Sequence, residues 1–440
     1  MTQQIKQVCT VLFILLPIFL ITGPAVPDII ITLTGIIFLI FVFLKKFNLD
    51  LKNNHFLQIT VFFWVSLLII SIFAIDKLKS FQDSIIFLRF LIIPLSCYFL
   101  FFKEMKNLNY LLIIIFILVI FVCLDTLYQF FNYSPENGFG TDILGFKSSW
   151  YGRLTGPFGE ELIPGSYVSK FGLAGYVLLL INDNLRKKYM IHIFYLSLIL
   201  IVCFISGERM AFATYSLALM MLVLFLKNNR LVIFLSIIVG TIIIFSFFKL
   251  HPFYNDYKVL ESNQYHQGLK IEKSYKCEDD NDKICTKIIQ IQPTFLQILK
   301  NFSTSAYGEI YLLSIEMFKD NPITGIGINN FKYLCEKKQY YRELMVNYNC
   351  ASHPHNTYIQ WLTEGGLIIF FIFLMYLIIL CNLIYRNNGD REYKVISLVL
   401  LLILFWPIMS TGSLVKNWYG ISVFFIIAIS MCISRIKKSI

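Results

Sequence analysis

The residues best suited to chemistry are two histidines in the segment Cys350-Ala351-Ser352-His353-Pro354-His355-Asn356. Proline favours the first turn of a helix, so the sequence predicts a helix beginning here with His355 in its first turn. The positive end of a helix disfavours an imidazolium, and a neutral imidazole can accept a proton as a general base. His353, Asn356 and, two turns further on, Glu364 are candidates for binding the substrate. The competing interpretation is a histidine that only caps the helix.

Basic residues in or beside apolar segments are the candidates for binding an anion. Arg89 and Lys170 lie within such segments, and Arg209 opens another one after Ser206-Gly207-Glu208. A charge at the bilayer centre costs about 2.5–3.5 kcal/mol on insertion scales, so these residues are expected to face a cavity or a partner. A lysine near the end of a span can instead extend to the interface. Because a guanidinium binds phosphate oxygens in pairs, Arg209 and Arg153 suit a lipid pyrophosphate head group.

A metal site is the weaker interpretation of the histidine segment. His353, His355 and Cys350 are close enough in sequence to chelate zinc. His-x-His beside proline is not a usual spacing for structural zinc, and Cys350 is expected to be oxidised. We therefore expect neither a metal nor another cofactor.

The composition predicts the elements that must position these residues. Of 440 residues, 57% are hydrophobic and 15% are charged, and the mean hydropathy is +0.68. A soluble protein of this size needs more polar surface than this. The net charge of +11 does not indicate a nucleic-acid partner, because the basic residues sit in short loops between apolar runs. We expect an all-α polytopic membrane protein in contact with membrane lipids.

Helical spans need about 20 apolar residues. The expected spans, roughly twelve, are residues 8–22, 28–44, 56–75, 84–102, 110–131, 165–182, 189–205, 209–226, 230–248, 357–384, 394–409 and 417–434. They divide the chain into three parts. Residues 1–248 hold nine spans and an outer loop at 132–164, residues 249–354 form one large outer loop with short helices, and residues 355–440 hold the last three spans.

The charges of the short loops predict the orientation. One set of loops holds seventeen lysines and arginines, whereas the opposite set, without the large loop, holds five. Loops rich in lysine and arginine stay in the cytoplasm. Both termini are therefore expected in the cytoplasm, and segments 132–164 and 249–354 on the outer side.

The large outer loop contains four cysteines, Cys277, Cys285, Cys335 and Cys350. In an oxidising compartment they predict up to two disulfides. The more local pairing joins Cys277 to Cys285 and Cys335 to Cys350, and other pairings or free thiols remain open. The segment 257–290 is polar and expected to be loosely folded.

Helical spacing of apolar residues predicts a partly buried helix from Ala306 to Lys319 in the same loop. It ends at Asp320-Asn321-Pro322, and Gly325-Ile326-Gly327 follows. Without a preceding strand and a βαβ unit, these glycines indicate a tight turn and not a nucleotide-binding loop.

Five segments in order resemble the O-antigen ligase and O-antigen polymerase superfamily. They are residues 153–159 (RLTGPFG), 206–209 (SGER), 321–327 (NPITGIG) followed by Phe331, 353–358 (HPHNTY) and 364–366 (EGG). The likeness is strongest over residues 200–370. Two features depart from the ligase pattern: Ile369 replaces a second glycine, and Gly308-Glu309 stand where a second arginine is usual. Arg342 is the only arginine of the loop and is a further candidate for binding the donor diphosphate or the substrate.

The resemblance implies a metal-independent glycosyltransferase with a GT-C-like helical bundle. It would take a glycan from undecaprenyl diphosphate at the periplasmic face of the bacterial inner membrane. The acceptor is the lipid A-core in ligases and another lipid-linked repeat unit in polymerases. By the family pattern, His355 is the base that deprotonates the acceptor hydroxyl, and Arg209 binds the donor diphosphate.

A polytopic transporter or lipid flippase is the alternative from another functional class. Transporters usually show paired half-repeats and ionisable groups near the midplane of the bilayer. The sequence shows no such symmetry, and Asp125 is the one obvious carboxylate deep in a span. The transferase, ligase or polymerase, is therefore the preferred prediction.

Overall fold

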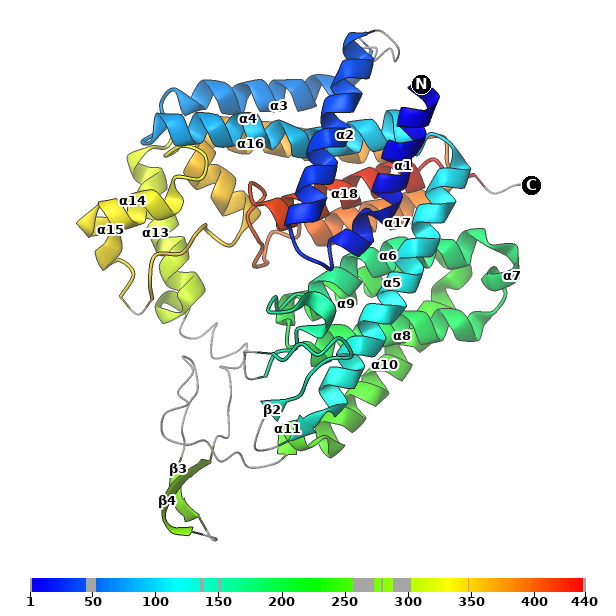
Figure 1. The fold of residues 1–440 in the computed structure, drawn as a ribbon, viewed down its shortest axis with the longest axis vertical. Coiled ribbons are helices and arrows are strands. Elements are labelled where there is room, and N and C mark those ends of the chain that lie inside the picture. Colours follow the sequence, from blue (N-terminus) through cyan, green and yellow to red (C-terminus); the bar gives the residue numbers. More distant parts are fainter. Residues whose placement is uncertain are drawn as a thin grey trace. The chain divides into compact units, whose positions relative to one another are not determined.

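The structure is a computed structural model that describes residues 2–44, 53–134, 138–148, 152–255, 273–277, 280–287, 302–346 and 348–437. Within these ranges helices predominate, and the strands form two sheets of two strands each (Figure 1). The chain divides into two compact units, each of which is described by itself. Unit 1 comprises residues 1–114 and 301–440, and unit 2 comprises residues 115–300.

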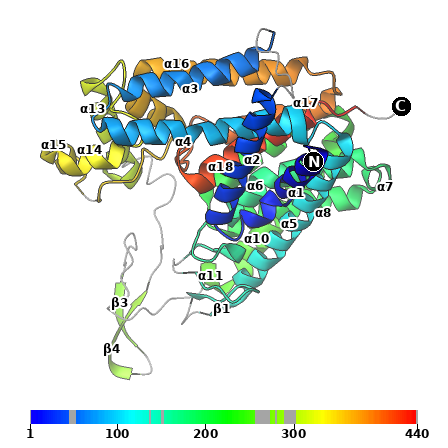
Figure 2. The same cartoon turned by 45° about the horizontal axis from the view of Figure 1, so that its top comes forward.

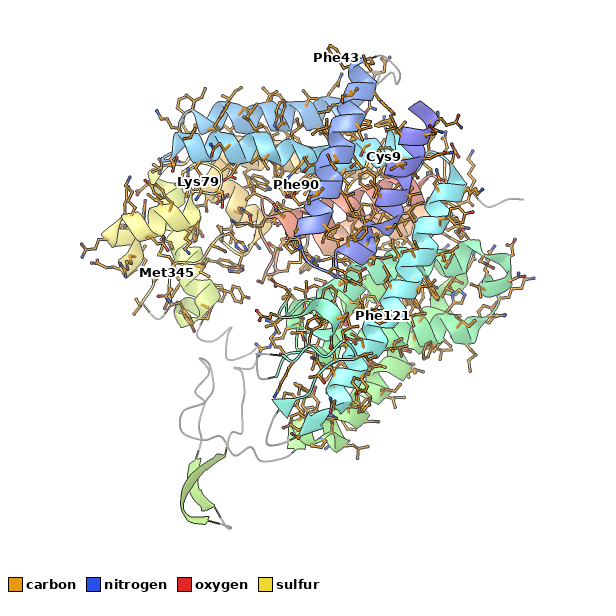
Figure 3. All side chains as sticks on the ribbon, in the orientation of Figure 1. Cys9, Phe43, Lys79, Phe90, Phe121 and Met345 are labelled. Carbon is orange, nitrogen blue, oxygen red and sulfur yellow. A yellow bond between two sulfur atoms is a disulfide. The ribbon has the colours of Figure 1, made fainter. Side chains whose placement is uncertain are left out.

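Six described helices are long and apolar enough to cross a membrane. They are Ala25–Phe43, Lys77–Phe101, Met105–Phe131, Pro164–Ile181, Lys227–Leu250 and Thr357–Arg386. Shorter apolar helices accompany them, and large apolar side chains such as Phe43 (86% exposed) lie on the outside (Figure 3). Exposed apolar surface on this scale suits lipid and not water. The chain is a multi-pass membrane protein, as its composition predicts.

Unit 1 contains most of the helices that flank the histidine segment. Its helices are α1 (Thr2–Phe19), α2 (Ala25–Phe43), α3 (His55–Ser71), α4 (Lys77–Ser96, continued as a π-helix over Cys97–Phe101), α13 (Ala306–Asp320), α14 (Phe331–Lys337), α15 (Gln339–Glu343), α16 (Thr357–Arg386), α17 (Arg391–Leu404) and α18 (Asn417–Ile433). Helix α17 ends before Trp406-Pro407, so the helix expected over 394–409 is shorter than predicted.

Helices α3, α4 and α16 lie side by side in unit 1 (Figures 1 and 2). Aromatic rings fill the space between them. The edge of Trp361 meets Phe63 at 5.4 Å and Phe87 at 5.7 Å between ring centroids. Such edge-to-face pairs add about 0.5–1.5 kcal/mol each beyond their buried area. This core fixes the first half of α16, which follows the histidine segment.

The short loops of unit 1 gather at two ends. At one end Lys6 lies 3.6 Å from Glu104, Arg435 donates to the carbonyl of Tyr98 at 2.7 Å, and the Tyr98 hydroxyl donates to Asn387 at 2.7 Å. These contacts join the start of α1, the connection between α4 and α5 (Met105–Phe131), the α16–α17 connection and the residues after α18. These four segments, which the charge count places in the cytoplasm, thus meet at one end of this unit.

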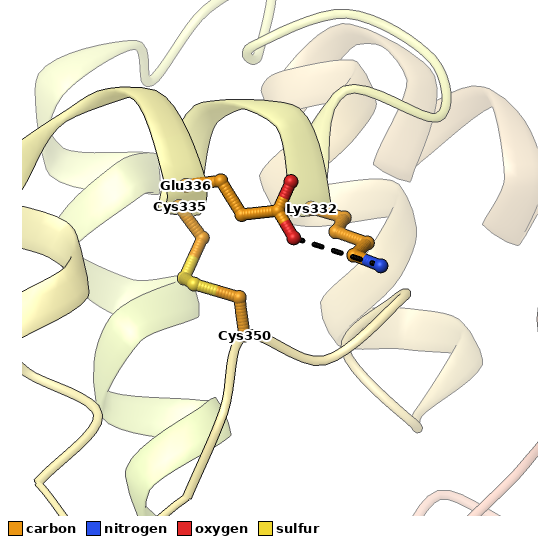
Figure 4. Close-up of a disulfide and its surroundings, with 4 residues drawn as sticks. All are labelled: Lys332, Cys335, Glu336 and Cys350. Atoms are coloured by element: carbon orange, nitrogen blue, oxygen red, sulfur yellow. Dashed lines mark ion pairs between the residues drawn. A yellow bond between two sulfur atoms is a disulfide. The ribbon is translucent and has the colours of Figure 1, made fainter.

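Helices α13, α14 and α15 form a small core of their own. It includes Leu313, Met317, Phe331 and Tyr341, all essentially fully buried. A disulfide joins Cys335 of α14 to Cys350, with 5.9 Å between the two Cα atoms (Figure 4). The predicted helix over 306–319 and this local disulfide are confirmed. The side chains of Cys277 and Cys285 lie outside the described residues, so their pairing stays a prediction.

Helix α16 is broken at Gly366, whose φ of 63° lies in the left-handed region. The 321–327 turn fills the break, and its backbone replaces the hydrogen bonds that α16 loses. These bonds are Ile326 N to Thr363 O (3.0 Å), Gly327 N to Glu364 O (2.9 Å), Leu367 N to Pro322 O (2.9 Å) and Ile368 N to Ile323 O (3.3 Å). Broken helices are tolerated in membranes when neighbouring groups satisfy the freed backbone in this way.

Unit 2 consists mainly of helices that pack on one another. Its elements are the larger part of α5 (Met105–Phe131), β1 (Tyr133–Ser134), β2 (Gly138–Phe139), α6 (Pro164–Ile181), α7 (Asp183–Arg186), α8 (Tyr189–Ile205), α9 (Arg209–Phe225), α10 (Arg230–Leu250), α11 (Pro252–Asn255), β3 (Lys273–Cys277) and β4 (Asp280–Lys287). Helices α6, α8, α9 and α10 contact one another. Within the segment 257–290, strands β3 and β4 pair antiparallel, and the rest lies outside the described residues.

Candidate functional site

The histidine segment of unit 1 leads into α16 through an asparagine cap. The Oδ1 atom of Asn356 accepts hydrogen bonds from the backbone N–H groups of Tyr358 (3.0 Å) and Ile359 (3.1 Å). Its Nδ2 atom donates to the carbonyl of Pro407 at 2.7 Å. Helix α16 therefore begins at Thr357, and the prediction that His355 lies in its first turn is wrong. The asparagine side chain satisfies the first free amides, so it sets the helix start three residues after Pro354.

His355 occupies a constrained position just before this cap. Its φ of 53° is in the left-handed region, which is unusual for a residue with a side chain. Its carbonyl accepts a hydrogen bond from the N–H of Thr411 at 2.8 Å. The imidazole lies between two rings, with centroid distances of 4.0 Å to His353 and 5.9 Å to Tyr307. Strained backbone of this kind is frequent at functional sites.

The surroundings of His355 favour its neutral form. The side chain is half-buried, and this burial lowers the pKa of His355 below its usual value of 6.5. A hydrogen bond from the ring to the backbone of Thr411 opposes this shift with a smaller effect, and it occupies only one of the two ring nitrogens. A neutral ring with an unused nitrogen lone pair is what a general base requires.

His353 differs from His355 in that both of its ring nitrogens are occupied. Its Nε2 lies 3.1 Å from the carbonyl oxygen of Thr411, which can only accept, so Nε2 carries the hydrogen. Its Nδ1 then accepts a hydrogen bond from the Ser352 hydroxyl at 2.8 Å. Burial, with a smaller contribution from His355, lowers the pKa of His353 to about 4. His353 is thus a fixed neutral ring that supports His355 from one side.

Glu364 lies inside unit 1 and is fully buried. Its Oε2 accepts a hydrogen bond from Gln360 at 3.0 Å, and the same Gln360 nitrogen donates to the Ser413 hydroxyl at 2.7 Å. The Oε1 atom is buried without a hydrogen-bond partner among the described residues. The backbone carbonyl of Glu364 accepts the hydrogen bond from the Gly327 N–H at the break in α16. Its binding of substrate stays a prediction.

In unit 2 the expected cations gather around Glu208. This buried carboxylate accepts hydrogen bonds from the backbone N–H of Gly165 at 2.7 Å and from the N–H and hydroxyl of Ser166. It thereby caps the N-terminus of α6, where a negative charge is stabilised. Arg153 and Lys170 both interact electrostatically with Glu208, and Arg209 is the next residue along the chain.

Backbone contacts hold two motif segments together beside this carboxylate. The N–H of Leu154 donates to the carbonyl of Ser206 at 3.2 Å. Gly207 has a φ of 76°, and a side chain there would collide with the carbonyl of Gly152. The Arg153 guanidinium donates to the carbonyl of Leu162 at 3.0 Å, while its Nε is buried without a partner among the described residues. Two cations, Arg153 and Lys170, thus lie within electrostatic range of Glu208, and the Arg209 side chain is exposed.

The other two expected cations lie elsewhere in unit 1. Arg89 forms an ion pair with Asp28 and donates to Asn417 at 2.7 Å, and Asn417 in turn donates to Asp28 at 3.2 Å. This network ties α4 to α2 and α18. Arg342 is exposed at the end of α15. Binding of substrate by either residue stays a prediction.

The metal alternative loses one of its three ligands. Cys350 is in the disulfide with Cys335, and a disulfide sulfur is not the thiolate that binds zinc. Within the ranges that the structure describes, no group of three or more histidine, cysteine, aspartate or glutamate side chains is placed to hold a metal ion.

Sequence reasoning missed three residues of these sites. Thr411 holds both histidines through its backbone, Tyr307 contacts His355, and Glu208 centres the cations. The first two are far from His355 in sequence and carry no local signal. Glu208 was part of a recognised motif, and a carboxylate next to an arginine at a span boundary could have marked it.

Comparison with known proteins bears on the family alone. Residues 194–374 match the family model described as O-antigen ligase. The match includes Glu208, Arg209, the 321–327 turn, His355 and Glu364. No curated protein matches the chain. The chain therefore carries a domain of the O-antigen ligase family.

Proposed function

With an O-antigen ligase family domain as the premise, we propose that this protein transfers a glycan from undecaprenyl diphosphate to an acceptor hydroxyl at the periplasmic face of the bacterial inner membrane. The observation that carries the proposal is His355: a half-buried imidazole at a strained backbone position, with one ring nitrogen bonded to the backbone of Thr411 and no partner for the other among the described residues. Its neighbour His353 lacks a free nitrogen. His355 is therefore the base of the reaction.

The proposed reaction is a single displacement. His355 accepts the proton of the acceptor hydroxyl as that oxygen attacks the anomeric carbon of the donor sugar. The bond between this carbon and the phosphate oxygen breaks, and undecaprenyl diphosphate leaves with the electron pair. Arg209, with Arg153 and Lys170, binds the diphosphate and stabilises its growing negative charge. Guanidinium groups suit this task because they bind phosphate oxygens in pairs.

The proposed orientation places both termini in the cytoplasm and the histidine segment on the outer side. Roughly twelve spans in a GT-C-like bundle follow from the same proposal. Support comes from unit 1, where contacts join the basic loops at the end of α16 opposite to His355. Positively charged loops are retained in the cytoplasm.

The proposal is tested by replacing the base in the full-length chain. His355→Ala is expected to abolish glycan transfer, while the variant still inserts into the membrane. Lys332→Ala, an exposed change in the same outer segment, serves as the control and is expected to retain activity. Normal transfer by a well-expressed His355→Ala variant would remove the catalytic assignment.

The donor site is tested in the same assay. Arg209→Ala is expected to raise the KM for the donor and to lower kcat, because charge on the diphosphate increases as it leaves. Lys187→Ala, an exposed cation in the α7–α8 connection, is the matched control. An unchanged KM and kcat for Arg209→Ala would contradict the assignment.

We propose the lipid A-core as the acceptor, which makes the protein a ligase, and the joining of lipid-linked repeat units, as in a polymerase, is the alternative. Deleting the gene and separating the envelope glycans on a gel distinguishes them. Loss of all long chains from the core is expected for a ligase. A core that carries a single repeat would instead identify a polymerase.

A further inference from the structure

A cavity of about 380 Å³ lies in unit 1, at the opposite end of α16 from His355. The 30 residues of α16 span about 45 Å at 1.5 Å per residue. The polar and aromatic lining comes from three elements and the residues after α18. It includes Asn54, His55, Tyr98, Asn382, Arg386 and Arg435. None of these residues has a role in the proposed transfer reaction.

The charge of this lining suits an anion. Arg386, Arg435 and His55 line the cavity, and no carboxylate is among the lining residues. In the part of the chain that the structure describes, neither arginine forms an ion pair with a carboxylate. Unpaired arginines in a cavity between membrane helices favour binding of a phosphate group.

Arg435 is held in place before any ligand binds. Its guanidinium lies flat on the Tyr98 ring, 3.2 Å from the centroid, and Nη1 donates to the Tyr98 carbonyl at 2.7 Å. The Tyr98 hydroxyl is in turn bonded to Asn387. A guanidinium fixed on one edge keeps its other N–H groups for a bidentate contact with phosphate, and little rotamer entropy is lost on binding.

Apolar residues complete the cavity. Phe99, Ile379 and Leu383 contribute to its wall beside the arginines. The start of α3 at Asn54 and His55 adds the partial positive charge of a helix N-terminus. An apolar wall adds nothing to the binding of free phosphate. It can contact the acyl chain that a lipid carries next to its head group.

We propose that this cavity binds the head group of an anionic membrane phospholipid, with the phosphate between Arg386 and Arg435. The site goes beyond the transfer reaction and does not depend on it. Its volume is at the lower end of small-molecule sites, about 300–1,000 Å³, and suits a head group better than a whole lipid.

The test is lipid binding by the purified full-length chain in neutral detergent, measured by native mass spectrometry. Phosphatidylglycerol is expected to bind more tightly than phosphatidylcholine. Arg386→Gln is expected to weaken phosphatidylglycerol binding about fivefold, the effect of about 1 kcal/mol per basic residue. Arg391→Gln, an exposed arginine outside the cavity, is the matched control and is expected to leave binding unchanged.

Three results would overturn the proposal. Equal affinity of wild type and Arg386→Gln would remove the cavity as the site, and equal binding of the two lipids would remove its charge selectivity. Displacement of phosphatidylglycerol by millimolar inorganic phosphate would show a site for the free anion. Because Arg435 also supports Tyr98, Arg435→Gln is interpreted only if its thermal unfolding matches that of wild type.

Discussion

The two neighbouring histidines are distinguished by what their ring nitrogens contact. Both nitrogens of His353 are in hydrogen bonds, and this fixes the ring and its tautomer. The His355 ring lies 4.0 Å from that ring between centroids and is tilted by 40° to it, and the Thr411 backbone engages only one of its two nitrogens. The sequence offers two equivalent candidates, and only the contacts of Thr411 and Ser352 separate them. We expect His355 to act as the base and His353 to position it.

The first prediction concerns pH. Burial lowers the pKa of His355 below 6.5, so the neutral base persists to lower pH than in an exposed histidine. Transfer activity is lost only as the pH falls through this lowered pKa. The acid limb of the kcat/KM profile is therefore expected to have its midpoint below 6.5.

A variant that exposes His355 to water should shift the acid limb of the kcat/KM profile to higher pH. Tyr307→Ala removes a ring that contacts His355, so the midpoint is expected to move upward toward 6.5. Tyr340→Ala, at an exposed tyrosine of α15, is the control and should leave the profile unchanged. A wild-type midpoint at or above 6.5 would contradict the assignment of the base.

The second prediction separates a structural from a substrate-binding role for Arg89. This guanidinium is bonded to Asp28 and Asn417, and removing one partner of such a network leaves the others unpaired. Arg89→Gln is expected to lower the free energy of unfolding by about 1–3 kcal/mol, less than for a fully buried pair because both side chains are partly exposed. Thermal unfolding in detergent measures this.

The KM for the donor tests whether Arg89 binds substrate instead. Lys77→Gln, an exposed cation at the start of the same helix, is the control for both measurements. If Arg89→Gln raised the donor KM and left stability unchanged, Arg89 would belong to the donor site and not to the helix network.

At the scale of elements, the break in α16 explains in physical terms why the 321–327 and 364–366 segments both contain glycines. The two segments exchange four backbone hydrogen bonds. Gly366 and Gly325 permit this close approach, since a side chain at either would collide with backbone of the other segment. These motif residues therefore shape the helix that follows the histidine segment.

The third prediction tests this junction. Gly366→Ala is expected to destabilise the protein by about 3 kcal/mol or more, because it combines a left-handed φ with a backbone collision. Gly35→Ala is the matched control in α2: its added carbon would meet Ile92 at 3.7 Å, an ordinary contact. Thermal unfolding of both variants in detergent provides the comparison. Equal stability of the two would contradict the described geometry.

The elements were largely predictable from the sequence, whereas their contacts were not. Apolar run length predicts the spans, and apolar spacing predicts the helix over 306–319. Pro354 is the local signal in the sequence and predicts a helix that already includes His355. The cap is provided by Asn356, so α16 begins at Thr357. The partners of Arg89 and His355 lie hundreds or tens of residues away, and a single sequence carries no signal for such pairs.

For the whole molecule, sidedness is the property that decides whether the proposed chemistry is possible. Undecaprenyl-linked glycans are expected on the outer face, so the histidine segment must be there too. The basic loops of unit 1 gather at the other end of α16, in agreement with retention in the cytoplasm.

The fourth prediction measures this sidedness with single cysteines. Ser352→Cys and Asn388→Cys place exposed thiols at the two ends of α16. A membrane-impermeant maleimide is expected to label Cys at 352 from the outer side and Cys at 388 only after permeabilisation. The reverse pattern would place His355 in the cytoplasm and overturn the proposed function.

The hydrogen bonds between the 321–327 turn and α16 also constrain how the chain is assembled. Backbone groups at the break would each cost several kcal/mol if left unpaired in lipid. A newly inserted segment 357–386 is therefore more stable as an unbroken helix until the turn reaches it. The turn precedes α16 in the chain, so it has been synthesised before that helix. Docking of the 321–327 turn and bending of this helix are therefore expected to occur together.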